Sequence, residues 1–273
     1  MHVLRISFIA LVVSTLELAT PPRSEGAEAT PAPSNPQAPS RHPRYESEYQ
    51  HRVFKGTGNG ELSYGWLTPL KPEAGEKYPL VICLHGAGGG VKASSVLIRP
   101  PMRQQHPAFV MVPEADRPFT WAKTDVIKRA GLPPELPEKL PVLIETIRSL
   151  LKTESIDPAR IYITGQSMGG VGSWGAIARY PELFAAAVPV CGAWHVEDVP
   201  KMKGVAVWAF HGEKDPTVPV AFSRDLTAAL TKAGGTARYT EYPEVPHNSW
   251  EKAYEETEMW KWLFGQRKAA AGN

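Results

Sequence analysis

The sequence predicts an α/β fold: a mostly parallel, eight-stranded sheet with a leading antiparallel hairpin and helices on both faces. Eight short runs of strand-type residues follow one another, and helix-length segments separate the later ones. Such spacing demands parallel pairing through right-handed crossovers. The first two runs are joined instead by the glycine-rich link Gly56–Gly60, which is typical of a hairpin. With 273 residues and 42 % apolar side chains, the chain can bury the core of one large domain.

The expected strands differ in how apolar they are, which indicates their place in the sheet. Tyr78–Leu84 (YPLVICL) is apolar throughout, as in a strand that is buried on both faces. In chain order the expected strands are Gln50–Lys55, Glu61–Leu67, Tyr78–Leu84, Phe109–Pro113, Ile161–Thr164, Ala185–Cys191, Val205–Phe210 and Ala237–Tyr242.

The expected helices show apolar residues at three- and four-residue steps. The pattern is clearest from Leu140 to Leu151 and recurs from Phe222 to Leu230 and from Trp250 to Leu263. A fourth helix is expected to end with Ala176–Tyr180, because Pro181 cannot continue it.

The two ends of the chain are expected to lie outside the domain. Residues 1–29 combine a basic start, a short apolar stretch and a small-x-small site, which predicts a secretory signal peptide; the alternative is a retained membrane anchor. The proline-rich residues 30–43 are expected to be a disordered tether, residues 44–265 the domain and residues 266–273 a disordered tail. The mature protein is then secreted or periplasmic, without an integral membrane segment.

Composition excludes several classes of protein. Lys plus Arg number 30 against 28 for Asp plus Glu, so the sequence lacks the basic excess of a nucleic-acid partner. Two cysteines exclude a disulfide scaffold and a multi-cysteine metal site. Cys83 and Cys191 lie on strands expected to have another strand between them, about 9.6 Å apart and beyond disulfide reach. They are predicted to be buried apolar side chains.

A candidate nucleophile follows the strand Ile161–Thr164 directly. Gly165-Gln166-Ser167-Met168-Gly169 matches G-x-S-x-G in its required strand–turn–helix setting. A serine on so tight a turn takes a strained backbone conformation, and glycines two places away remove the clashes that side chains would cause. Ser167 is therefore predicted to present its hydroxyl above the carboxyl edge of the sheet, where parallel α/β sheets bind ligands.

A serine hydroxyl needs a base and an orienting acid, in the chain order Ser, Asp or Glu, His. Asp215 follows the strand Val205–Phe210 and His247 follows Ala237–Tyr242, so both lie at strand ends in the right order. Weaker candidates for the acid are Asp198 and Glu213. His85 and His211 are expected to be structural, and Asp225 to lie on a solvated helix face.

The oxyanion hole needs two backbone N–H groups. Met168, directly after the serine, is predicted to supply one. The second is expected from the loop His85-Gly86-Ala87-Gly88-Gly89-Gly90, with Ala87 favoured and Gly86 as the alternative. This run lacks both G-x-G-x-x-G and a terminal Gly-Lys-Ser/Thr, so it predicts neither a dinucleotide nor a phosphate loop.

Together these motifs resemble the α/β-hydrolase superfamily. The segments that carry the resemblance are Leu84–Gly89, the specific run Asp157–Gly170, Gly212–Pro219 and His247. Over about residues 45–265 the chain is similar to the secreted esterase and polyhydroxybutyrate-depolymerase-like branch, which includes feruloyl and acetylxylan esterases and predicted peptidases of the prolyl-oligopeptidase kind. The resemblance implies that Ser167 is the nucleophile, His247 the base and Asp215 the acid, with no metal and no cofactor.

The substrate side of the sequence is less specific. Gly192–Gly204 is too short for the helical lid that larger members insert there, and no propeller domain is present to screen peptides. The site is expected to be open, with a long wall at Glu114–Leu136. Four aromatic side chains are candidates for binding substrate: Trp121, Trp194, His195 and Trp250.

These observations predict a serine hydrolase that cleaves carboxylic esters through an acyl-enzyme. Its expected substrates are small-molecule or polymeric: short-chain, aryl or polysaccharide-linked acyl esters, and polyesters. Two alternatives stay open. One is a peptidase that uses the same triad, and the other is a catalytically silent polymer-binding module.

Overall fold

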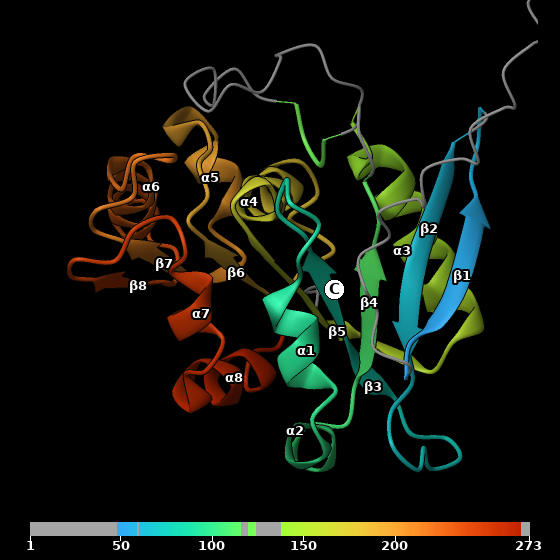
Figure 1. The fold of residues 1–273 in the computed structure, drawn as a ribbon. Helices are drawn as coiled ribbons and strands as arrows, with labels where there is room; N and C mark the ends of the chain where they lie inside the picture. The colour runs from blue at the N-terminus through green and yellow to red at the C-terminus, as the bar shows by residue number, and fades with distance from the viewer. Residues whose placement is uncertain (1–47, 59, 116–119, 124–137, 269–273) are drawn as a thin grey trace, which may run out of the picture. The chain divides into compact units, whose positions relative to one another are not determined.

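A single eight-stranded sheet organises the computed structural model, which describes residues 48–58, 60–115, 120–123 and 138–268. The strand order is β1-β2-β4-β3-β5-β6-β7-β8 (Figure 1). β1 pairs antiparallel with β2, and β2 pairs antiparallel with β4, whereas the remaining pairs are parallel. The predicted fold class is therefore confirmed. The strands are β1 Gln50–Lys55, β2 Glu61–Leu67, β3 Tyr78–Leu84, β4 Phe109–Pro113, β5 Ile156–Gln166, β6 Ala186–Val190, β7 Ala206–Gly212 and β8 Ala237–Tyr242.

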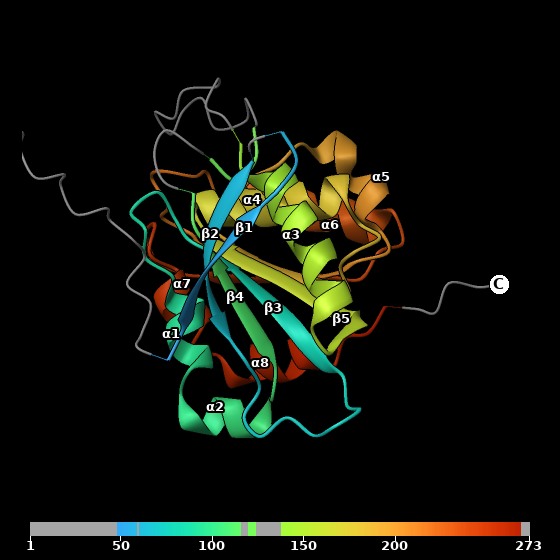
Figure 2. The same cartoon turned by 90° about the vertical axis from the view of Figure 1, so that its right-hand side faces the viewer.

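Helices cover both faces of the sheet, as Figure 2 shows. Along β3, Leu80, Ile82 and Leu84 join one buried apolar cluster and Val81 and Cys83 join the other, because successive side chains alternate across a strand. The first cluster packs under α3 Leu140–Thr153, α4 Met168–Arg179 and α6 Ala221–Lys232. The second packs under α1 Lys92–Leu97, α2 Pro100–Gln105, α7 Trp250–Ala253 and α8 Thr257–Phe264.

Several predicted boundaries differ from the structure by one or two residues, and three differences are larger. β5 begins five residues earlier than expected. The final helix is broken into α7 and α8, and the carbonyl of buried Tyr254, which lies between them, accepts a hydrogen bond from the Trp260 indole. The predicted tail from residue 266 is wrong for its first three residues: Tyr162 donates to the Gln266 carbonyl, Arg267 pairs with Asp157, and the Lys268 amide donates to Ala159. Residues 269–273 lie outside the described part of the chain, as do residues 1–47.

Two predictions about the sheet are confirmed. β5 lies between β3 and β6, and Cys83 and Cys191 are both free and buried. The connection from β6 to β7 holds only a 3₁₀ turn at Val196–Asp198 and the one-turn helix α5 Val199–Met202, so no lid domain is inserted there. This topology brings the carboxyl ends of β3, β5, β6, β7 and β8 to one edge of the sheet, which is where the predicted chemistry-bearing residues lie.

Candidate active site

Ser167 lies on the sharp turn between β5 and α4 in a strained conformation. Its φ of 55° and ψ of −116° are values that side-chain-bearing residues rarely adopt. A Cβ at Gly165 would collide with the backbone of Gly169, and a Cβ at Gly169 would collide with the carbonyls of Leu84 and His85. Both glycines are therefore required for β3, β5 and α4 to approach this closely, as the sequence predicts.

The three residues predicted as a triad come together. Ser167 Oγ lies 2.8 Å from His247 Nε2, and His247 Nδ1 lies 2.6 Å from Asp215 Oδ2. Asp215 follows β7 and His247 follows β8, so residues far apart in the chain meet because their strands end at the same edge. In this chain of hydrogen bonds, Nδ1–H donates to the carboxylate, which leaves Nε2 as an acceptor for the serine hydroxyl.

The Asp215 side chain is fully buried but well supplied with donors. Oδ1 accepts from the backbone amides of Thr217 at 2.8 Å and Val218 at 2.9 Å, and Oδ2 lies 3.2 Å from His211 Nε2 in addition to its bond with His247. Burial alone would raise the pKa of this carboxyl, but the donors, His211 and His247 foremost, hold its pKa well below the usual range. Asp215 is therefore a permanently charged acceptor at neutral pH.

The competing acids make other contacts. Asp198 accepts from the Trp194 indole at 3.0 Å and pairs with Lys201 at 2.6 Å. Glu213 lies 3.5 Å from Lys214 and accepts from the Glu244 amide. Each has its own surface partners, and neither has a recorded contact with His247. The geometry therefore favours Asp215.

One group of potential metal ligands occurs among the described residues, and it overlaps this site. A ligand atom from each of Cys191, Asp215 and His247 lies within 4.8 Å of the others. Burial raises the pKa of the Cys191 thiol far above neutrality, so the sulfur stays protonated. A metal would also have to displace the Asp215–His247 hydrogen bond. The donor set is thus poorly suited to an ion and well suited to a hydrogen-bonded relay.

The loop after β3 packs directly against the serine turn. A Cβ at Gly86 would lie 3.6 Å from the Ser167 Cβ, and the Gly89 amide closes a turn onto the Gly86 carbonyl, with Ala87 and Gly88 at its centre. Gln166 Oε1 accepts from the Lys92 amide at 3.1 Å and ties the far end of the loop down. Met168 is the first residue of α4, so its N–H has no acceptor within the helix.

His85 braces this loop, as the sequence predicts. Its Nε2 accepts from the Ala115 amide at 3.0 Å, while its carbonyl accepts from the Trp121 indole at 2.9 Å. The His85 ring and the Trp121 ring meet edge to face. This bracing connects β3 to the segment after β4 and is structural.

Two of the four aromatic candidates for substrate binding are core residues. Trp121 is fully buried, and a Cβ at Gly172 of α4 would meet it at 2.5 Å. Trp194 is 3 % exposed, packs against Gly175 and carries the Arg179 guanidinium over its ring. Contrary to the prediction, neither indole is exposed to substrate, because α4 lies against both where its glycines leave room. Most of the predicted wall Glu114–Leu136 lies outside the described residues.

The other two candidates remain partly exposed. Trp250 opens α7 and contacts the His247 ring edge to face, with centroids 5.4 Å apart. His195 contacts the Trp194 ring at 5.7 Å. Trp250 is therefore the candidate whose ring lies against His247.

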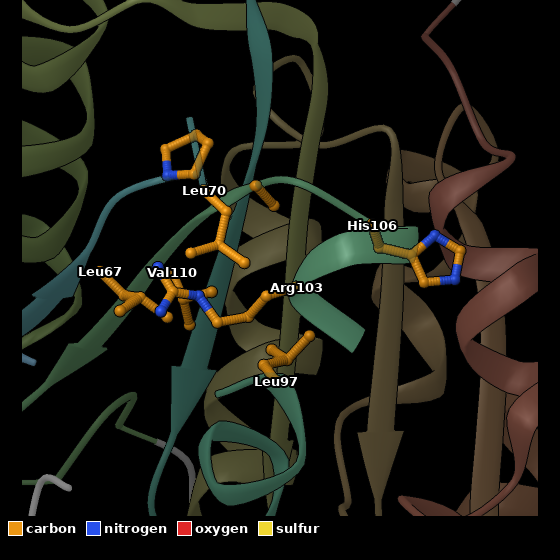
Figure 3. Close-up of a pocket in the computed structure, with 8 residues that line it drawn as sticks. Leu67, Leu70, Leu97, Arg103, His106 and Val110 are labelled. Atoms are coloured by element: carbon orange, nitrogen blue, oxygen red, sulfur yellow. The ribbon is translucent and has the colours of Figure 1, made fainter. Parts of the chain in front are cut away.

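A depression elsewhere in the molecule is separate from this site. Figure 3 shows it between β2, β4 and the helices α1 and α2, lined by Leu67, Leu97, Arg103 and Val110 among others. Val110 stands at the amino end of β4, so the depression lies away from the carboxyl edge that carries Ser167. None of the residues that line it belongs to the Ser167–His247–Asp215 chain.

A family model described as Phospholipase/Carboxylesterase matches residues 70–260, which contain Ser167, Asp215 and His247. The chain belongs to this family. Its structure is that of an α/β-hydrolase, the superfamily indicated by the motifs.

Solved structures agree with this assignment. One described as a thermostable esterase has a TM-score of 0.75 and 39 % identity; the match covers 81 % of this chain and 64 % of that one. An acylaminoacyl peptidase of Pyrococcus horikoshii has a TM-score of 0.62 with 16 % identity over 83 % of this chain and 43 % of that one, which shows a shared fold alone.

Two curated relatives are matched over part of their length. A protein of Arthroderma benhamiae, described as an uncharacterized secreted protein, is 26 % identical over 249 residues, 73 % of this chain and 25 % of the relative. Poly(3-hydroxyalkanoate) depolymerase C of Paucimonas lemoignei is 29 % identical over 121 residues, 42 % of this chain and 28 % of the relative. The chain thus spans about a quarter of the length of these relatives.

Proposed function

We propose that the protein is a serine esterase that cleaves carboxylic esters through a covalent acyl-enzyme. The observation that carries the proposal is the continuous chain from Ser167 Oγ to His247 Nε2, at 2.8 Å, and from His247 Nδ1 to Asp215 Oδ2, at 2.6 Å. These distances lie within the range for a nucleophile, its base and the group that orients the base.

In the first half-reaction, Ser167 Oγ attacks the ester carbonyl carbon while His247 Nε2 takes the hydroxyl proton. The developing oxyanion accepts from the backbone N–H of Met168 and from that of Ala87, with Gly86 as the alternative donor. Asp215 holds the Nδ1–H tautomer and stabilises the imidazolium. The carbon–oxygen bond to the alcohol then breaks, and the alcohol leaves with the proton from Nε2.

In the second half-reaction a water molecule takes the place of the alcohol. His247 removes its proton, the hydroxide oxygen attacks the acyl carbon, and the bond to Ser167 Oγ breaks as Nε2–H returns the proton. The products are the free acid and the original enzyme. The chain's own residues carry each of these steps.

Two features near Ser167 and His247 support a substrate class. The thirteen residues from Gly192 to Gly204 form two short turns and not a lid, and Trp250 offers a partly exposed indole beside His247. A β6–β7 connection without a lid and an aromatic side chain beside His247 suit short acyl, aryl or sugar-linked esters, and polyesters. The depolymerase and esterase names among the similar proteins support this class.

We further propose that the protein is exported. The signal-like residues 1–29 motivate this, and one relative is named as a secreted protein. None of the helices in the described part of the chain is long and apolar enough to cross a membrane.

The test compares an ester and an amide that share the acyl group and the chromophore: p-nitrophenyl butyrate and butyryl p-nitroanilide. We expect kcat/KM for the ester to be orders of magnitude higher, because an amine leaves only with full protonation whereas a phenolate leaves readily. A Ser167→Ala variant is the blank for both substrates. A higher kcat/KM for the anilide would indicate a peptidase. A rate for Ser167→Ala equal to that of wild type would contradict the serine mechanism.

A second panel narrows the ester class. Acetyl, butyryl, octanoyl and feruloyl esters and polyester film, at matched enzyme concentrations, give the order of preference. The proposed substrate class predicts activity on the short-chain or aryl esters. The β6–β7 connection without a lid predicts no jump in rate when a short-chain ester passes its solubility limit. Such a jump would indicate an interface-driven lid.

A further inference from the structure

His211 is a second histidine in contact with Asp215. It lies near the end of β7, four residues before Asp215, and its side chain is fully buried. Its Nε2 lies 2.9 Å from the Val218 carbonyl and 3.2 Å from Asp215 Oδ2. Its Nδ1 lies 2.7 Å from the hydroxyl of Ser223, which is also fully buried, on α6. The ring thus spans the distance between the α6 helix and the carboxylate.

The hydrogen positions follow from these partners. The Val218 carbonyl and the Asp215 carboxylate only accept, so Nε2 carries a hydrogen and donates to both. The buried Ser223 hydroxyl has one recorded side-chain partner, His211, and satisfies its hydrogen by donating to Nδ1. The neutral Nε2–H tautomer therefore satisfies every polar atom of this arrangement, and Ser223 selects it.

The charged groups around this pair leave the contact undisturbed. Glu241 on β8 is the register partner of His211, and Arg224 neutralises this carboxylate with two hydrogen bonds at 2.8 and 2.7 Å. On the Asp215 side, the neighbours are His247 and the protonated thiol of Cys191. Both histidines thus donate to Asp215. His247 also exchanges protons with the substrate in the proposed mechanism, whereas His211 is buried at the end of β7 and does not.

We infer that His211, held by Ser223, is a positioning residue that fixes Asp215 Oδ2 for His247 and withdraws part of its negative charge. This inference rests on the proposed function. His211 touches no reacting atom, so it acts only through Asp215. In its absence the carboxylate would be freer to rotate and would bind the imidazolium of His247 more strongly.

Removal of the His211 donor should change the pH dependence of activity in one direction. A carboxylate that binds the imidazolium more strongly makes the protonated, inactive base easier to form. Activity, which needs neutral His247, then appears only at higher pH. Removing the His211 donor should therefore move the acid limb of the kcat/KM profile upward by about half a unit to one unit. It should also lower kcat while KM changes little, because no substrate contact is removed.

The experiment compares His211→Leu with His211→Gln in the full chain. Leucine fills the space without a donor, whereas the glutamine amide nitrogen can replace Nε2–H. The readouts are the pH profile of p-nitrophenyl butyrate hydrolysis and the pH dependence of Ser167 labelling by a fluorophosphonate. We expect the upward shift in His211→Leu in both readouts and its reversal in His211→Gln. An unshifted midpoint in His211→Leu, or an equal shift in both variants, would overturn the inference.

Two controls keep the outcome decisive. If His211→Leu does not fold, Ser223→Ala is measured in its place. Its acid limb should move upward by a smaller amount than expected for His211→Leu. A shift no larger than that of the control variant Thr227→Ala would contradict the inference. Thr227 is a buried hydroxyl residue one turn along α6 that bonds the Ser223 carbonyl and does not touch His211. Wild type and Ser167→Ala are measured alongside. Equal hydrolysis rates for wild type and Ser167→Ala would refute the proposed function. An unshifted pH midpoint in His211→Leu, with an active wild type, would refute only the role of His211.

Discussion

The two ends of the Ser167–His247–Asp215 chain are held in place by different physical means. Ser167 is placed by backbone sterics: its strained φ persists because Gly165 and Gly169 let β3, β5 and α4 meet without side chains between them. Asp215 is placed by hydrogen bonds from two amides and two imidazoles. A steric arrangement fails abruptly when an atom is added, whereas a hydrogen-bonded one weakens by degrees as donors are removed.

The largest effect is expected at the serine itself. Ser167→Ala should lower kcat by roughly 10⁴–10⁶, because the nucleophile is lost. The melting temperature should change little, since the glycines that shape the turn remain. Steady-state hydrolysis of p-nitrophenyl butyrate and a thermal melt measure the two quantities. Retention of more than a tenth of the wild-type kcat would contradict the assignment.

The acid should come next. Asp215→Asn should lower kcat by about 10⁴, because an amide cannot hold His247 in the Nδ1–H tautomer that the serine needs. Asp225→Asn is the matched control, since Asp225 is exposed on α6 and lies ten residues away in sequence. Similar kinetics for the two variants would show that Asp215 is not the orienting acid.

Addition of a single methyl group at Gly169 tests the steric placement of Ser167. Gly169→Ala would drive a Cβ into the carbonyls of Leu84 and His85, so it should cost about 1–3 kcal/mol or more in the free energy of unfolding. At roughly 2–4 °C per kcal/mol, the melting temperature should fall by several degrees. Gly204→Ala meets nothing within 4 Å and should melt like wild type. Equal melting temperatures for the two variants would show that the close approach is unnecessary.

The pH dependence of the melting temperature tests the hydrogen bonds that place Asp215. This effect is expected to be the smallest. The pKa of Asp215 is lowered in the folded state, so its charge stabilises the fold above the unfolded value of about 3.9. That stabilisation is lost as the pH falls through this value toward the folded pKa. The gap in melting temperature between wild type and Asp215→Asn should therefore be wider at pH 6 than at pH 3. A gap that is constant or widens toward pH 3 would contradict this account.

The same contrast explains what the sequence could predict. Strand runs, the glycine-flanked serine and the order Ser167, Asp215, His247 are local patterns, and the sheet topology converts them into one site because parallel strands end at one edge. The boundaries of most strands follow from apolar runs for the same reason. Sterics at Gly165 and Gly169 could be anticipated because they depend on the backbone alone.

What sequence reasoning missed depends on side-chain direction. Trp121 and Trp194 follow strands as substrate-binding residues often do, yet glycines on α4 draw both indoles into the core. The sequence marked His211 only as structural; its four-residue spacing before Asp215 was the available signal, but a buried contact needs the orientation of both rings. The order at Gln266–Lys268 likewise depends on distant partners: Arg267 pairs with Asp157, more than a hundred residues earlier in the chain.

Covalent labelling tests the central claim most directly. A fluorophosphonate probe is added to the full chain, residual hydrolysis of p-nitrophenyl butyrate is followed, and the modified peptide is located by mass spectrometry. The account predicts one adduct, on Ser167, with hydrolysis lost in proportion to labelling, and no labelling of Ser167→Ala at the same probe concentration. Full activity after complete labelling, or an adduct on another residue in step with the loss of activity, would contradict it.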